Sequence, residues 1–230
     1  MSLSQFKHSL ATRGWASTEP VIDAAAIASL REYAASVALV GRGGARNLLD
    51  DQRIRDLAAS PTLRTFACAV LGDRCFAVRA LLFDKTPEAN WKVVWHQDLT
   101  ISTQQRAEIA GYSPWTVKAG VPHVQPPVAV LQAMLALRLH LDPCGSDNGP
   151  VRVIDGTDRL GRIEAEAVAT LRAERGETEC VVDEGALLAF RPLLLHASAP
   201  ATRPGHRRVI HIEYAATDLA EPLVWHRRVA

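Results

Sequence analysis

The stretch WKVVWHQD, residues 91–98, combines a predicted strand with two candidate metal ligands, and the rest of the chain is best understood in relation to it. Residues 93–96 have the composition of a β-strand, in which every second side chain points to the same face. His96 and Asp98 therefore project together, an imidazole beside a carboxylate. They are two of the three donors of a 2-His-1-carboxylate site, which suits Fe(II) and leaves neighbouring coordination positions open. The third donor has to come from a distant part of the chain.

Length, composition and charge limit the type of protein. The chain has 230 residues, of which 48% are hydrophobic, and a formal net charge of +1. We expect one core and a single domain over residues 1–230. Acidic and basic residues are interspersed, which argues against nucleic acid or an anionic membrane as a partner and favours a small molecule. There is no apolar run of roughly 18 residues, and the four cysteines show no metal-binding spacing, so we expect a soluble, cytoplasmic protein.

Helical signals concentrate in residues 1–72. Asp23 and Ser60 are suited to cap helices over about 26–37 and 61–71, and another helix begins near Asp50. The glycine-rich residues 41–44 lack the Lys-Ser/Thr ending of a phosphate-binding loop, so we interpret them as a plain turn. This part of the chain is predicted to be a helical buttress for the rest.

Residues 73–216 show short apolar runs separated by proline and glycine, which is typical of strands. The predicted strands are 75–83, 93–96, 135–141, 151–154, 179–182, 186–191, 193–196 and 207–215, with helices at 128–134 and 164–174. Many strands with helices gathered at the start predict a mainly β, α+β fold: a double-stranded β-helix, or cupin-like jelly roll, with N-terminal helices packed on one sheet. Residues 217–230 are predicted to be a tail, and residues 99–127 a long loop that is a candidate lid.

The pattern His-x-Asp/Glu is weak by itself because it occurs three times, at His96/Asp98, His140/Asp142 and His211/Glu213. A jelly-roll metal site takes its paired ligands from an early strand and its third ligand from a late one. Only the first pair has enough predicted strands before a later histidine. The second runs into a turn and the third has no histidine-bearing strand after it. The first pair is therefore favoured, with an ordinary surface polar pair as the alternative.

Candidates for the third ligand are His123, His196, His206 and His226. His196 stands out because residues 186–195 are almost wholly apolar, which places it at the mouth of a core strand. The alternative is a core histidine bonded to a backbone carbonyl.

The last predicted strand places Arg208, Ile210, Ile212 and Tyr214 on one face and Arg207, Val209, His211 and Glu213 on the other. If the first set packs against the helices or the second sheet, Arg207 faces the cavity. A guanidinium there can grip a carboxylate through two hydrogen bonds, which lysine cannot do. Otherwise both arginines are solvated charges at a strand start.

At four landmarks the sequence resembles the phytanoyl-CoA dioxygenase-like family of Fe(II)/2-oxoglutarate oxygenases. They are WHQD at 95–98, DNGP at 147–150 with VIDGT at 153–157, GALLAF at 185–190 leading to His196, and RRVI at 207–210. The resemblance implies that His96, Asp98 and His196 bind Fe(II). It also implies that Arg207 binds the C5 carboxylate of 2-oxoglutarate, assisted by Ser198. Asp158 departs from the family, where many relatives have histidine.

The same resemblance implies a dioxygenase that consumes O2 and 2-oxoglutarate, releases succinate and CO2, and oxidises a C–H bond of a small, possibly anionic, organic substrate. Because related halogenases lose the carboxylate that stands here as Asp98, hydroxylation or desaturation is favoured. Arg138 and His140 from one strand, and Trp115, Lys118 and His123 from the long loop, are candidate substrate contacts.

Two other functions remain open at this point. A cupin-like metal enzyme that does not use 2-oxoglutarate would share the three ligands but would not need Arg207. A non-catalytic jelly-roll binding module would tolerate the loss of the metal. The oligomeric state is left open.

Overall fold

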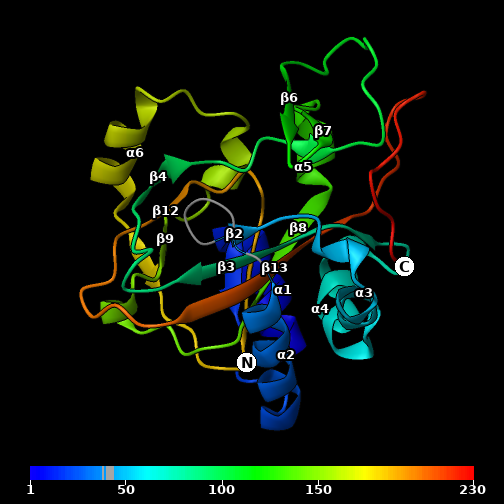
Figure 1. Ribbon diagram of the computed structural model, residues 1–230. Helices are drawn as coiled ribbons and strands as arrows, with labels where there is room; N and C mark the ends of the chain where they lie inside the picture. Colours follow the sequence, from blue (N-terminus) through cyan, green and yellow to red (C-terminus); the bar gives the residue numbers. More distant parts are fainter. Residues whose placement is uncertain (38, 40–43) are drawn as a thin grey trace.

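The structure is a computed structural model that describes residues 1–37, 39 and 44–230, and it has the predicted α+β jelly-roll architecture (Figure 1). Two antiparallel sheets face each other, and helices cover the outer face of the larger one. The predicted glycine-rich turn falls mostly on residues 41–43, which lie outside the described residues; Gly44 begins a short strand.

The N-terminal part forms four helices, α1 (Leu3–Arg13), α2 (Ala24–Ser36), α3 (Gln52–Ala59) and α4 (Pro61–Leu71), with a 3-10 turn η1 (Leu48–Asp50) before α3. The predicted caps are confirmed: the Asp23 carboxylate accepts from the Ala26 N–H at 2.9 Å, and the Ser60 hydroxyl accepts from the Leu63 N–H. Helix α1 was not predicted, because its apolar face is narrow.

The larger sheet has six strands in the order β1-β11-β8-β13-β3-β2, and each neighbouring pair is antiparallel. The smaller has the order β10-β9-β12-β4. The bounds are β1 Trp15–Ser17, β2 Gly44–Ala45, β3 Phe76–Lys85, β4 Val93–His96, β8 Met134–His140, β9 Val151–Val153, β10 Thr178–Cys180, β11 Leu187–Phe190, β12 His196–Ser198 and β13 Arg207–Ala215. The remaining helical segments are α5 (Val128–Gln132), α6 (Ala167–Arg175), η2 (Ser146–Asn148) and η3 (Thr157–Leu160).

The two faces of strand β13 have different surroundings, as the alternation of its side chains predicts: one packs in the core and the other lines a cavity. Ile210, Ile212 and Tyr214 join the hydrophobic core under the N-terminal helices, and the Tyr214 hydroxyl donates to the Ala58 carbonyl of α3 at 2.8 Å. Residues of the opposite face, among them Arg207 and His211, line a cavity between the sheets. The helices therefore anchor one face of β13 and leave the other to the site.

Two predicted segments differ in the structure. The apolar residues 193–195 are not a strand: residues 191–194 form a turn closed by the Leu194 N–H and the Arg191 carbonyl, and β12 begins only at His196. Burial demands apolar side chains in either conformation, so composition alone could not distinguish them. The long loop 99–127 contains a small sheet, β5 (Ile101–Ser102), β7 (Val121–Val124) and β6 (Trp115–Lys118) in that order.

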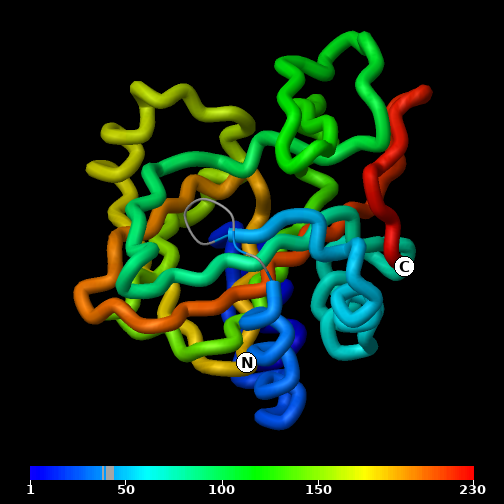
Figure 2. The backbone as a smooth tube through the Cα atoms, viewed as in Figure 1, coloured from blue at the N-terminus to red at the C-terminus, as the bar shows by residue number. Residues whose placement is uncertain are grey.

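The C-terminal tail packs on the body of the protein. Val229 pairs with Ala77 at the start of β3, and the His226 N–H donates to the Ser102 carbonyl. Figure 2 shows the C-terminal segment beside the segment 99–127, which was predicted to be a long loop. Within the described residues, the helices are too short or too polar to cross a bilayer.

Candidate active site

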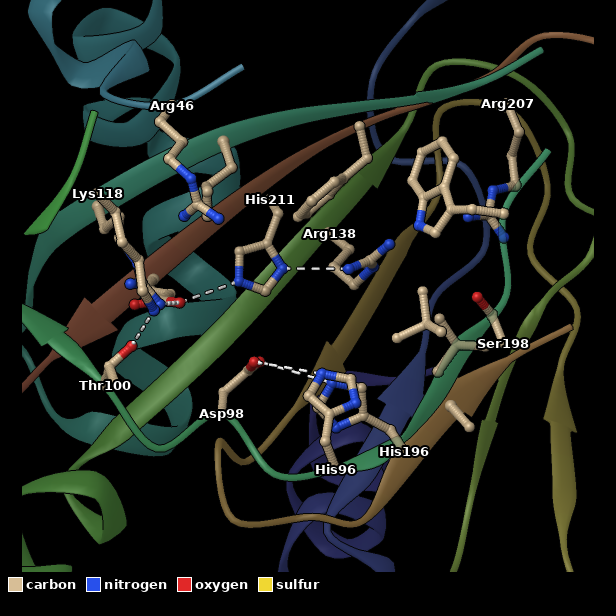
Figure 3. A pocket seen from close by; sticks show the side chains of 18 residues that line it. Arg46, His96, Asp98, Thr100, Lys118, Arg138, His196, Ser198, Arg207 and His211 are labelled. Atoms are coloured by element: carbon tan, nitrogen blue, oxygen red, sulfur yellow. Dashed lines mark hydrogen bonds and ion pairs between the residues drawn. The ribbon is translucent and has the colours of Figure 1, made fainter. Parts of the chain in front are cut away.

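The structure brings His96, Asp98 and His196 together between the two sheets (Figure 3). His96 ends β4, His196 begins β12, and the two residues are direct partners in the antiparallel ladder. The Asp98 N–H donates to the Pro192 carbonyl at 2.8 Å, which fixes the backbone just beyond β4. The Asp98 carboxylate lies 3.8 Å from Nε2 of His96 and 3.7 Å from Nε2 of His196. Three donors from two distant segments therefore converge.

The hydrogen bonds of His96 and His196 engage Nδ1 of each ring and leave Nε2 free to bind a metal. Nδ1 of His96 lies 2.8 Å from the Val94 carbonyl, and Nδ1 of His196 lies 2.9 Å from the Leu194 carbonyl. A carbonyl only accepts, so each Nδ1 carries the proton and each Nε2 keeps its lone pair. Such a bond also fixes the ring orientation of a metal-binding histidine.

The charge states suit a divalent cation. Burial, together with repulsion by other positive groups, lowers the pKa of His196 to about 4 despite the attraction of Asp98, so this imidazole is neutral at physiological pH. Burial alone raises the pKa of Asp98, but His196, His211, His96 and Arg79 outweigh it and hold that pKa well below its usual range. Two neutral imidazoles and one carboxylate are the donor set of the facial triad, so the residues fit Fe(II).

A second group, Asp98, His211 and Glu213, also has donor atoms close together. Glu213 is already paired with Arg79, and the His211 ring spans Glu213 Oε1 at 3.2 Å and Arg138 Nη1 at 3.3 Å. Because the carboxylate and both ring nitrogens are engaged, this group is less suited to a metal. The preference for the first His-x-Asp pair is consistent with this geometry.

Gln97, which the sequence analysis did not single out, holds the turns behind the site. It points away from the metal side of the strand, and its side-chain amide donates to the Gly161 carbonyl at 2.8 Å and the Leu193 carbonyl at 2.6 Å. Its carbonyl oxygen accepts from the Ile163 N–H at 2.9 Å. Gln97 is 7% exposed; its bond to the Leu193 carbonyl is buried, and its bonds to Gly161 and Ile163 are partly buried.

We expect Gln97→Leu to lower the free energy of unfolding by about 3 kcal/mol, because it removes the hydrogen-bond partner of one buried and two partly buried backbone groups. Urea denaturation followed by circular dichroism measures the change. The control is Gln104→Leu, at an exposed position, where a change within about 0.5 kcal/mol is expected. Equal stability of the two variants would contradict the role of Gln97.

Arg207 and Ser198 lie at the other end of the cavity from the small sheet (Figure 3). Arg207 is 3% exposed, and its Nη1 donates to the Gly149 carbonyl. Its Nε has no hydrogen-bond partner among the described residues, although it is buried. Lys85 stands beside this pair, with Nζ 3.2 Å from the Ser198 hydroxyl and 2.7 Å from the Ala199 carbonyl. An unpaired buried guanidinium nitrogen beside a second cation favours an anionic ligand here.

The cavity has a volume of about 240 Å³ and contains the triad, Arg207 and Ser198 along its wall. Of the predicted substrate residues, Arg138 and Lys118 line it. Trp115, His123 and His140 do not belong to the described lining. Trp115 packs in a hydrophobic cluster of the small sheet, and the ring of His123 bonds the Val121 carbonyl. His140 is 1% exposed, and burial lowers its pKa well below the usual value. Of these five residues, we therefore expect only Arg138 and Lys118 to contact a substrate in this cavity.

Strand β3 supplies cavity residues that the sequence analysis missed. Arg79, Leu81 and Phe83 line the cavity, and Lys85 continues the same face. The signal was present: charged residues recur on one face of a strand that is otherwise apolar. Arg46, from the end of β2, also lines the cavity but has no recognisable motif around it.

Asp158, the departure from the family pattern, is half-buried in η3. Its Oδ1 has no partner among the described residues, and burial raises its pKa. It lies outside the described lining of the cavity, so the donor set does not depend on it.

Comparison with known proteins identifies the family of this chain. The family model for phytanoyl-CoA dioxygenase (PhyH) matches residues 16–209, which include all three donors and Arg207. The chain belongs to the phytanoyl-CoA dioxygenase family. The family that the sequence motifs indicated, that of Fe(II)/2-oxoglutarate oxygenases, is thereby confirmed. A search among curated proteins found no match.

Several solved structures share the fold of this PhyH-family chain. EctD from S. alaskensis in its apoform has a TM-score of 0.74 at 19% identity, covering 96% of this chain and 80% of that one. The non-heme alpha-ketoglutarate-dependent epimerase SnoN from nogalamycin biosynthesis has a TM-score of 0.70 at 14% identity, covering 93% and 80%. AviO1 from Streptomyces viridochromogenes Tue57 has a TM-score of 0.68 at 22% identity, covering 96% and 97%. At these identities the likeness establishes the fold.

Proposed function

We propose that this protein is an Fe(II)- and 2-oxoglutarate-dependent dioxygenase that hydroxylates a C–H bond of a small organic substrate, with release of succinate and CO2. The observation that carries the proposal is one cavity that has a facial donor triad and, at its end, the buried Arg207 with an unpaired Nε. Neither a cupin-like enzyme without 2-oxoglutarate nor a binding module needs both features.

Relatives of the same fold support the choice of cofactors. EctD has been solved with bound Fe and, separately, with 2-oxoglutarate and 5-hydroxyectoine. SnoN has been solved with Fe3+, alpha ketoglutarate and nogalamycin RO. For this chain we propose Fe(II) as the metal, 2-oxoglutarate as the co-substrate and O2 as the oxidant.

The chain's residues would divide the work as follows. His96 and His196 hold the metal through Nε2, and Asp98 neutralises one of its charges. Bound iron, with O2 and 2-oxoglutarate, supplies oxidation of a C–H bond. Arg207 grips the distal carboxylate of 2-oxoglutarate, with the Ser198 hydroxyl beside it, so the keto acid is oriented toward the triad. Arg138 adds a positive charge to the cavity between these two sites. Because Asp98 occupies the third position, we propose hydroxylation rather than halogenation.

Anaerobic titration with Fe(II) and then 2-oxoglutarate tests the proposal. We expect a visible metal-to-ligand charge-transfer band that requires both additions, and slow conversion of 2-oxoglutarate to succinate once O2 is admitted. A protein that binds Fe(II) without responding to 2-oxoglutarate would be the cupin-like alternative. A protein that binds neither would be the binding module.

The pH dependence of co-substrate binding is expected to report on Lys85. Burial and repulsion by Arg207 lower the pKa of Lys85 to about 7. Binding of an anion favours the protonated ammonium, so 2-oxoglutarate should bind tightest below about pH 7 and weaken about threefold or more between about pH 6 and about pH 8. Calorimetry in buffers of different ionisation enthalpy should detect proton uptake near neutral pH.

Lys85→Met should abolish this proton uptake. Lys92→Met, at the exposed position directly before β4, should retain it. If Lys85→Met shows the same uptake as the wild type, another group is responsible.

A further inference from the structure

The cavity that contains the triad adjoins a second cavity of about 370 Å³. The two share five lining residues: Arg46, Leu81, Phe83, Trp91 and Lys118. The inner cavity, at about 240 Å³, is smaller than the roughly 300 Å³ at which pockets for drug-sized ligands begin. If 2-oxoglutarate occupies the inner cavity, a second reactant has to lie mainly in the outer one and pass the shared residues to reach the metal.

Two of the shared residues are cations without a carboxylate partner among the described residues. Lys118 is half-buried, and its Nζ donates to the Thr100 hydroxyl at 3.0 Å. Arg46 is exposed at the outer side and forms no ion pair with the described part of the chain. Arg79 is their cationic neighbour, but Glu213 neutralises it. Burial and repulsion by Arg79 and Arg46 lower the pKa of Lys118 and outweigh the attraction of Asp98 and Glu213, so an anion placed between Lys118 and Arg46 would be favoured.

A hydrogen bond links the two segments that carry these cations. Lys118 ends β6, and the turn that follows is bound to the other segment: the Asn47 side chain donates to the Ala119 carbonyl at 3.2 Å. Arg46 directly precedes Asn47. The long loop and the end of β2 are therefore tied together at this opening, which keeps both cations at the passage between the cavities.

The position is distinct from the proposed 2-oxoglutarate site. In Figure 3, Arg46 and Lys118 lie at one end of the cavity and Arg207 and Ser198 at the other, with the triad between them. The other shared residues, Leu81, Phe83 and Trp91, are apolar or aromatic. A cationic pair beside an apolar wall suits an amphipathic organic anion.

We propose that the oxidised substrate carries an oxyanion, a carboxylate or a phosphate monoester, which Arg46 and Lys118 bind, while its apolar part lies against Leu81, Phe83 and Trp91. This inference rests on the function proposed above. It makes Arg46 and Lys118 substrate-specificity residues with no part in holding 2-oxoglutarate.

Calorimetric titrations of the anaerobic Fe(II)–2-oxoglutarate complex test it with four probes: hexanoate, hexyl phosphate, inorganic phosphate and hexanol. At least one of the two amphipathic anions should bind, and its affinity should exceed that of hexanol by about tenfold or more. Whichever anion binds more tightly assigns the carboxylate or the phosphate. Inorganic phosphate should bind more weakly than hexyl phosphate, because it lacks the apolar part.

The variants Arg46→Gln and Lys118→Met should each weaken binding of the preferred anion by about tenfold, and the double variant more. The matched controls are Arg74→Gln and Lys92→Met, which remove exposed cations away from the cavity and should leave it unchanged. In all these variants the 2-oxoglutarate concentration that gives the half-maximal charge-transfer band should equal that of the wild type.

The proposal is overturned if neither amphipathic anion binds, if hexanol binds as tightly, if inorganic phosphate binds as tightly as the preferred probe, or if the double variant retains wild-type affinity. It is also overturned if Arg46→Gln or Lys118→Met weakens 2-oxoglutarate binding, because the cations would then belong to the co-substrate site. Failure of the proposed function looks different: the wild type would form no charge-transfer band. In that case, titration of the metal-free protein and its variants with the same four probes would show whether Arg46 and Lys118 bind an anion.

Discussion

Asp98→Ala is expected to abolish the charge-transfer band and to reduce conversion of 2-oxoglutarate to background. The variant leaves two neutral imidazoles, which bind Fe(II) weakly without the anionic donor. Even residues that only orient a metal ligand typically contribute about 10–100-fold to affinity, so loss of a donor should cost more than about 100-fold. Fe(II) affinity, measured anaerobically by competition with a chelator, gives the effect directly.

Asp183→Ala is the matched control. It removes the same side chain, an aspartate, from an exposed position outside the described lining of the cavity. It should bind Fe(II) and 2-oxoglutarate as the wild type does. The backbone bond from Asp98 to Pro192 survives in Asp98→Ala, so the fold should be retained and circular dichroism should be unchanged. Wild-type iron affinity in Asp98→Ala would refute the triad.

Arg207→Ala should weaken 2-oxoglutarate binding by about 30-fold or more while Fe(II) still binds. Arg207 is almost fully buried, and truncating one partner of a buried, hydrogen-bonded charge pair costs about 2–5 kcal/mol. Arg207→Lys should recover only part of the affinity, because an ammonium cannot form the paired hydrogen bonds of a guanidinium. The 2-oxoglutarate concentration at half-maximal charge-transfer absorbance is the measurement.

The neighbouring Arg208 provides a control on the opposite face of β13. Its guanidinium binds both oxygens of Asp142, at 2.8 and 2.7 Å. Arg208→Ala should therefore lower stability and leave 2-oxoglutarate affinity unchanged. If both arginine variants reduce the affinity equally, the effect comes from disruption of the strand and Arg207 is no specific anchor.

Much of the fold followed from local signals. The caps at Asp23 and Ser60 were readable because they depend on residues within one helical turn. The two faces of β13 were readable because side chains alternate along a strand whatever the strand pairs with. The apolar run at 193–195 was misread as a strand, since it is buried in a turn and burial requires the same composition in both conformations.

The donor types and their spacing could be predicted from local pattern: a His-x-Asp pair at the end of one strand, a histidine after an apolar run, and an arginine on the inward face of the last strand. These are properties of period and residue chemistry. Which polar side chains meet became visible in the folded chain. It placed Arg46, Arg79 and Lys85 around the site and left Trp115, His123 and His140 outside the described cavity lining. The physical reason is that convergence depends on how the sheets pair and pack across long sequence separations, which no local pattern encodes.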